Sequence, residues 1–239
     1  VLTYQRNVLW QTKVSLWEDA VRKAPQKARV HNNLGKAYLE KGRLREAESE
    51  FLKTISLDLS HVSAYNNLSS IYLKLGLYAK AAEYASLALA LDPTFVNARI
   101  NLGSAYGYMG RDREALQEFL EALKYMPENP GLYNNIGVIY AKSGQFDRAE
   151  TYFLRALSLK PDYPDPYLNL GIFYIKNGKP QQAVRYLRNF LQLRPNHPSG
   201  LYHLIVALRK AGSSEEAERY YLVLRSISPQ MAEKLNTVQ

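Results

Sequence analysis

The feature that most constrains the fold of this chain is a short motif that recurs every 34 residues without insertion. The motif is Asn-Leu-Gly with Tyr three residues further on, as at Asn101-Leu102-Gly103 and Tyr106. Related copies begin at Asn33, Asn67, Asn135 and Asn169, and a sixth at His203 keeps the phase but loses the residue types. A fixed period of this length predicts a stack of repeated units.

Each unit reads as two helices joined by a turn. We number the positions so that Asn33 is position 6, which gives units over 28–61, 62–95, 96–129, 130–163, 164–197 and 198–231. Mostly apolar or small residues at positions 4, 7, 8 and 11 share one helical face and define the first helix. Gly at position 15 of every unit predicts a left-handed helix end. The second helix carries Ala at position 20 and usually an aromatic residue at position 24, and Pro at position 32 generally ends it.

This pattern resembles the tetratricopeptide repeat family over essentially the whole chain. The resemblance implies an all-α fold, a right-handed superhelical solenoid of paired antiparallel helices, and we expect residues 1–239 to form one such solenoid. Position 4, usually aromatic in this family, is His31 in the first unit and Arg99 in the third. We expect looser packing at these two places.

The two ends of the chain are expected to close the stack. Residues 1–27 stay in register as a partial repeat, with a helix over 9–24. Residues 232–239 begin a further copy that stops early, and Met231 and Leu235 are placed to cover the last apolar face. Terminal repeats commonly degenerate because one side of them faces water.

Composition excludes several classes of function. The absence of cysteine rules out disulfides and thiol chemistry, and the four histidines have no metal-ligand spacing. We find no Gly-rich phosphate loop and no catalytic pair of carboxylates, so we expect no enzymatic activity, no cofactor and no metal. The net charge of +9 comes from basic residues interleaved with Glu, which indicates a solvated basic surface and no nucleic-acid site. No apolar run is long enough for a transmembrane helix.

The candidate binding residues share the face formed by positions 2, 6, 9 and 13 of the first helices. Asn is a poor residue for a helix interior, so its repetition at position 6 asks for a role beyond folding. Its carboxamide can pair with both the N–H and the C=O of a peptide backbone. We therefore expect an extended polypeptide to bind along the concave groove through the asparagine row: Asn33, Asn67, Asn101, Asn135 and Asn169.

Lysine recurs at position 13 of several units, beside the asparagine row. One interpretation is a cation that complements the carbonyl end of the first helix. The other is a basic rail along the groove, and the two are compatible. The lysines assigned to the peptide-binding face are Lys74, Lys142 and Lys176.

The asparagine row resembles the asparagine ladder of the O-linked N-acetylglucosamine transferases, which implies binding of substrate backbone. The alternative is that each Asn bonds to the neighbouring first helix and only rigidifies the stack. No three consecutive units hold the set of residues that a carboxylate clamp needs, so capture of a C-terminal carboxylate is not expected.

The start of the chain carries a second, shorter resemblance. The run from Tyr4 to Trp10, then Leu16 to Ala20 and Lys23 to Pro25, is similar to the junction after the last membrane helix of multi-spanning glycosyltransferase-like proteins. This implies an excised tail that faces the extracytoplasmic side and attaches to a membrane-embedded N-terminal part.

Three functions remain open at this point. The first is a non-catalytic protein-interaction scaffold that binds an extended polypeptide. The second is a substrate-presenting tail of a membrane-bound glycosyltransferase. The third is a scaffold that self-associates through its groove or an uncapped end.

Overall fold

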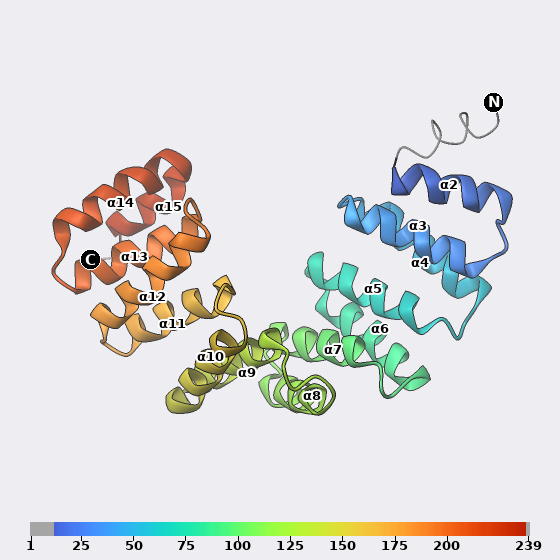
Figure 1. The fold of residues 1–239 in the computed structure, drawn as a ribbon, viewed down its shortest axis with the longest axis horizontal. Helices are drawn as coiled ribbons and strands as arrows, with labels where there is room; N and C mark the ends of the chain where they lie inside the picture. The colour runs from blue at the N-terminus through green and yellow to red at the C-terminus, as the bar shows by residue number, and fades with distance from the viewer. Residues whose placement is uncertain (1–11, 238–239) are drawn as a thin grey trace. The chain divides into compact units, whose positions relative to one another are not determined.

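The computed structural model describes residues 12–237 of the 239-residue chain. The described residues form fourteen α-helices and no strand, which confirms the expected all-α fold. They fall into two compact units, one ending at Met126 and one beginning at Pro127 (Figure 1). None of the described helices combines the length and the apolar character that a bilayer span requires.

The described residues of the first unit form seven helices. After α2 they form consecutive pairs, α3 with α4, α5 with α6 and α7 with α8, and each pair packs together. Their bounds are α2 Lys13–Lys23, α3 Ala28–Glu40, α4 Leu44–Leu57, α5 Val62–Lys74, α6 Tyr78–Leu91, α7 Val96–Tyr108 and α8 Asp112–Tyr125.

The second unit repeats the arrangement with three more pairs and a closing helix. In Figure 1 the two helices of a pair, such as α9 and α10, lie side by side. The bounds are α9 Pro130–Lys142, α10 Phe146–Leu159, α11 Pro164–Lys176, α12 Pro180–Leu193, α13 Pro198–Lys210, α14 Ser214–Ile227 and α15 Pro229–Thr237.

The turn inside each pair depends on the glycine at position 15. All six of these glycines have positive φ, between 66° and 82°, a region that residues with a Cβ rarely adopt. At Gly144, for example, the backbone N–H of the next residue, Gln145, bonds back to the carbonyl of Tyr140 at 2.9 Å. The left-handed helix end that the sequence predicts is confirmed.

The contact that sets the spacing of each pair joins position 8 to position 24 of the same repeat. A Cβ on Gly137 would lie 2.7 Å from ring carbons of Phe153, closer than side chains approach, and Gly35 meets Phe51 in the same way. The aromatic ring at position 24 therefore lies over the glycine of the first helix in its own repeat.

The repeats that lack this residue pair show that the two positions compensate each other. In the second repeat position 24 is the small residue Ala85, and position 8 is Ser69, which is larger than the glycine found there in other repeats. Both residues are fully buried. The Ser69 hydroxyl donates to the carbonyl of Ala81 at 2.8 Å, so the added oxygen is satisfied. In the sixth repeat Ile205 is fully buried at position 8, and Tyr221 at position 24 is only half-buried.

The expectation of looser packing at His31 and Arg99 is wrong. His31 is 5% exposed, with Nδ1 2.6 Å from Glu50 Oε2 and Nε2 2.9 Å from the carbonyl of Pro25. The Arg99 guanidinium likewise donates to Glu118 Oε2 and to the carbonyl of Pro93, both at 2.9 Å.

Tyrosine at the same position reaches the equivalent carbonyl. Tyr167, for example, donates to the carbonyl of Pro161 at 3.0 Å, and its ring faces Tyr186 with centroids 6.4 Å apart. In the first five repeats positions 4 and 23 therefore vary together, as two tyrosines or as His or Arg with Glu.

Both ends of the stack carry an extra helix, as expected, with shifted bounds. A capping box at Thr12 and Ser15 starts α2, and residues 9–11 of the expected helix lie outside the described residues. At the other end α15 begins at Pro229, earlier than the expected 232, and buries Ala232 and Leu235.

The compensation between positions 8 and 24 makes a testable prediction for the fourth repeat. Phe153→Ala should lower the free energy of unfolding by about 3–5 kcal/mol because it opens a cavity. Gly137→Ser should cost about 1–3 kcal/mol because the new side chain meets the ring. The double variant, which reproduces Ser69 with Ala85, should be more stable than the sum of the two losses predicts. Urea unfolding measures the coupling, and strict additivity would contradict it.

Candidate functional site

The predicted asparagine row lies on the first helices, one residue on each of α3, α5, α7, α9 and α11. All five side chains are half-buried, between the buried core positions on one side and exposed residues on the other. We call positions 2, 6, 9 and 13 of the first helices the amide face. Each of the two compact units has its own stretch of it.

In the first unit the amide face carries hydrogen bonds between neighbouring first helices. The Asn67 carboxamide nitrogen donates to Oδ1 of Asn32 at 3.4 Å. The Asn101 nitrogen donates to Asn66, to its Oδ1 at 3.0 Å and its backbone carbonyl at 3.3 Å. In both cases the acceptor is an asparagine at position 5 of the preceding repeat.

The second unit contains the shortest of these bonds. Asn169 donates to Oδ1 of Asn134 at 2.8 Å, and Asn134 is only 6% exposed. By contrast, the side chains of Asn33 and Asn135 make no hydrogen bond with other described residues. In the sequence, position 5 of the repeat before Asn135 is Ile100, which has no polar side chain.

The sequence signal for these partners is the doublet Asn-Asn. It occurs at 32–33, 66–67 and 134–135, and the first residue of each doublet serves the repeat that follows. The row therefore does tie neighbouring helices together where a partner exists. Among the described residues the Oδ1 of each tied carboxamide accepts no bond, and Asn67 and Asn169 also keep a second N–H, so this role leaves room for a ligand.

The sixth repeat places His203 where the others have Asn. Its Nδ1 lies 3.1 Å from the carbonyl of Ser199, so Nδ1 carries the proton and Nε2 is left as an acceptor. Burial, together with the nearby charge of Lys176, lowers the pKa of His203 to about 4. The imidazole is therefore neutral at physiological pH.

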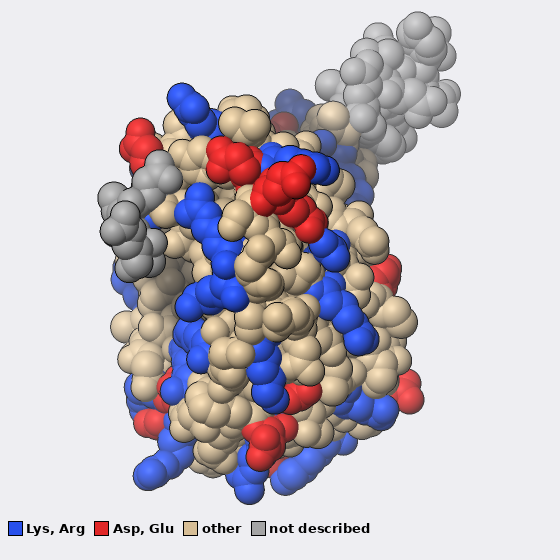
Figure 2. Space-filling view, turned by 90° about the vertical axis from the view of Figure 1, so that its left-hand side faces the viewer, with Lys and Arg blue, Asp and Glu red and all other residues tan. Residues whose placement is uncertain are grey.

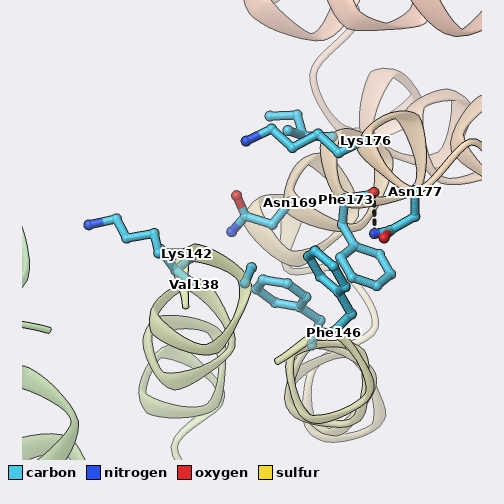
Figure 3. A pocket seen from close by; sticks show the side chains of 10 residues that line it. Val138, Lys142, Phe146, Asn169, Phe173, Lys176 and Asn177 are labelled. Atoms are coloured by element: carbon cyan, nitrogen blue, oxygen red, sulfur yellow. Dashed lines mark hydrogen bonds between the residues drawn. The ribbon is translucent and has the colours of Figure 1, made fainter. Parts of the chain in front are cut away.

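The three predicted lysines are exposed and stand in the last turns of α5, α9 and α11. There they complement the carbonyl ends of these helices, as one interpretation expected. Lys142 and Lys176 also flank Asn169, and Figure 3 shows the three side chains projecting toward the same side. Lys74 lies on the amide face of the first unit.

A hollow that the sequence interpretation missed lies between α9, α10 and α11. Its volume is about 160 Å³. Its lining combines residues of the amide face, such as Asn169, with residues of the buried core, such as Phe153 and Phe173. Phe146 and Phe173 form an apolar wall with ring centroids 5.8 Å apart, and Lys142, Asn169 and Lys176 stand on the opposite side (Figure 3). In the sequence, this hollow is indicated by the large apolar residue Phe146, which stands just after the turn.

The basic residues are less evenly dispersed than the sequence interpretation held. Residues 166–214 contain seven Lys and Arg residues and no Asp or Glu. Figure 2 shows the side of the molecule that carries part of the second unit. The charged side chains in the middle of that view are mainly basic and lie among uncharged residues, and acidic ones lie mainly toward its top and its lower part.

The described residues hold no group of His, Asp and Glu side chains that could bind a metal ion. The arrangement on the amide face is one of hydrogen-bond donors and acceptors, with cations at one edge. Such a face suits the binding of a chain with its own backbone donors and acceptors.

Several solved structures share the fold. One is PilW, a type IV pilus biogenesis factor, with a TM-score of 0.80 and 22% identity over 87% of this chain and 97% of that one. A second is the APC/C hetero-tetramer Cut9–Hcn1, with a TM-score of 0.85 and 22% identity over 95% of this chain and 45% of that one. A third is YrrB, described as having an unusual peptide-binding site, with a TM-score of 0.59 and 20% identity over 78% and 96%.

A curated relative matches a shorter segment. Protein O-mannosyl-transferase F38B6.6 of Caenorhabditis elegans is 36% identical over 59 residues, which is 25% of this chain and 9% of that protein.

The repeat profiles match far more of the chain. Profiles described as tetratricopeptide repeat match residues 14–58, 33–94, 131–163 and 168–232, and one described as TPR repeat matches 105–144. With its paired helices and its six turn glycines, the chain belongs to the tetratricopeptide repeat family.

Proposed function

We propose that this domain is a non-catalytic scaffold that binds an extended segment of a partner protein along its amide face. The tetratricopeptide fold is that of a protein–protein interaction scaffold, and the likeness to YrrB, which is described as having an unusual peptide-binding site, agrees with a peptide ligand. The proposal adds that the asparagine row reads the backbone of that ligand.

One observation carries the proposal. The nitrogen of Asn169 is held by buried Asn134 at 2.8 Å, and its Oδ1 accepts no bond from other described residues. The oxygen is thus oriented in advance toward the exposed side of the face, where a backbone N–H of a ligand can donate to it. Preorganisation of this kind lowers the entropy lost on binding.

The spacing of the row fits an extended chain. Packed helices lie about 8–10 Å apart, and an extended peptide rises about 3.3 Å per residue. One asparagine therefore meets the ligand about every three residues. Because the contacts are to backbone, binding by the row should tolerate many ligand sequences.

Two alanine variants separate the structural role of the row from its binding role. Asn169→Ala leaves buried Asn134 without its donor, so the free energy of unfolding should fall by about 1 kcal/mol relative to Asn135→Ala. Asn135→Ala breaks no internal bond and gains helix propensity, so its stability should stay equal or rise slightly. Both should weaken peptide binding about threefold to tenfold.

The probes for this test are end-blocked peptides of about twelve residues, chosen from a random peptide array and measured in solution by fluorescence anisotropy. Asn189→Ala, a half-buried asparagine on α12 away from the amide face, is the matched control and should bind like the unmodified protein. Unchanged affinity in Asn135→Ala and Asn169→Ala, with only the latter less stable, would assign the row to folding alone.

A second candidate function is favoured by the match to an O-mannosyl-transferase. We propose that, if the domain is joined to a sugar-transferring membrane part, the amide face holds the acceptor polypeptide beside it. The chemistry would then lie outside the residues of this chain, which supply only binding.

This candidate predicts a dependence on acceptor length. In membranes from cells that express the natural gene with Asn135→Ala, sugar transfer to a long unfolded acceptor should fall, because such an acceptor reaches the amide face. Transfer to a peptide of only a few residues should not change. Radiolabelled sugar incorporation measures both, and equal transfer to the long acceptor in variant and parent membranes would exclude the presenting role.

A further inference from the structure

The amide faces of the two units differ in chemistry. In the second unit position 9 is aliphatic throughout and position 13 is always lysine: Val138, Ile172, Val206, Lys142, Lys176 and Lys210. In the first unit the same positions are polar or mixed: Lys36, Ser70, Ser104, Glu40, Lys74 and Tyr108. Beside the row, every repeat of the second unit therefore combines an aliphatic residue at position 9 with a lysine at position 13.

The hollow between α9, α10 and α11 is a place for one apolar side chain. Its volume of about 160 Å³ is comparable to cavities that hold a benzene ring, of about 150 Å³. Phe146 is 44% exposed at its mouth, and Phe173 behind it is 7% exposed. Covering an exposed aromatic ring beside an open apolar hollow removes apolar surface from water, which favours binding.

The charge around the hollow is one-sided. No Asp or Glu lines it, and the sequence holds none from residue 166 to residue 214. Lys176 is exposed, forms no ion pair with another described residue and stands beside Asn169 (Figure 3). The charge of Lys176 also helps to lower the pKa of His203, so the electrostatic effect of this lysine reaches the next repeat.

From these observations we propose that the second unit selects an acidic and apolar partner segment. One large apolar side chain of that segment enters the hollow against Phe146 and Phe173. A carboxylate next to it pairs with Lys176, and its backbone lies on Asn169. This inference rests on the proposed function and adds the class of sequence that the face prefers.

The binding test uses the full chain and three end-blocked peptides, each a short repeat of one triplet. The triplets are Ser-Glu-Leu, Ser-Gln-Leu without the charge, and Ser-Glu-Ser without the apolar side chain. The Ser-Glu-Leu peptide should bind about tenfold tighter than either of the others at low salt. Its advantage over Ser-Gln-Leu should shrink as salt is added, because the lysine is exposed.

Variants locate the preference on the face. Lys176→Glu should weaken Ser-Glu-Leu binding at least tenfold and leave Ser-Gln-Leu binding unchanged. Lys160→Glu, an exposed lysine at the end of α10, makes the same change in net charge and should do neither. Phe146→Ala should weaken both leucine peptides and not Ser-Glu-Ser, and thermal melting checks that each variant is folded.

The outcomes separate this inference from the proposed function. If Ser-Gln-Leu and Ser-Glu-Leu bind equally well and both depend on Asn135, the acidic preference is wrong and backbone binding stands. If none of the peptides binds, both fail. If oligodeoxythymidylate of equal charge displaces Ser-Glu-Leu from Lys176 more strongly than unlabelled peptide does, the lysine serves phosphate and the inference is overturned.

Discussion

The contact between a position without a side chain and a large ring sets the geometry of this protein. In the fourth repeat Phe153 lies directly on the backbone of Gly137, and a Cβ there would be 2.7 Å from the ring. This close approach fixes how the first helix lies on the second. Because Gly at position 8 packs against a ring in three repeats and against Leu187 in a fourth, the outer positions of the first helices recur in register, and the amide face is the consequence.

The asparagine row combines two roles that the sequence interpretation set against each other. A carboxamide has more hydrogen-bonding capacity than one neighbour uses, so Asn169 can bond to Asn134 and still present an oxygen. The bond limits the rotation of the side chain, which favours a fixed direction for that oxygen. In this account the asparagine at position 6 presents its oxygen to the ligand, and an asparagine at position 5 of the preceding repeat, where there is one, holds it in place.

Much of the fold was predictable because the same pattern of residue types occurs in six repeats, so each position can be compared across all of them. The turn glycines, the helix-ending prolines and the buried positions 7, 8 and, in most repeats, 11 follow from residue type and spacing. Position 4, which the same face included, is only half-buried in four of the six repeats. What could not be predicted depends on which residue a side chain reaches. The salt bridge of Arg99 with Glu118, the bond from Asn169 to Asn134 and the hollow beside Phe146 each join residues far apart in the chain. The periodicity of the sequence predicts which residues share a helix face. Which distant side chain each of them contacts is seen only in the packed structure.

The central claim, that the amide face reads backbone, is tested most directly with ester-for-amide analogues of a bound peptide. Each analogue replaces one backbone N–H by an ester oxygen and keeps every side chain, so it removes only a donor. The account predicts that binding weakens at positions about three residues apart, the spacing of the row along an extended chain. Analogues that all bind like the parent peptide, while side-chain replacements abolish binding, would contradict it.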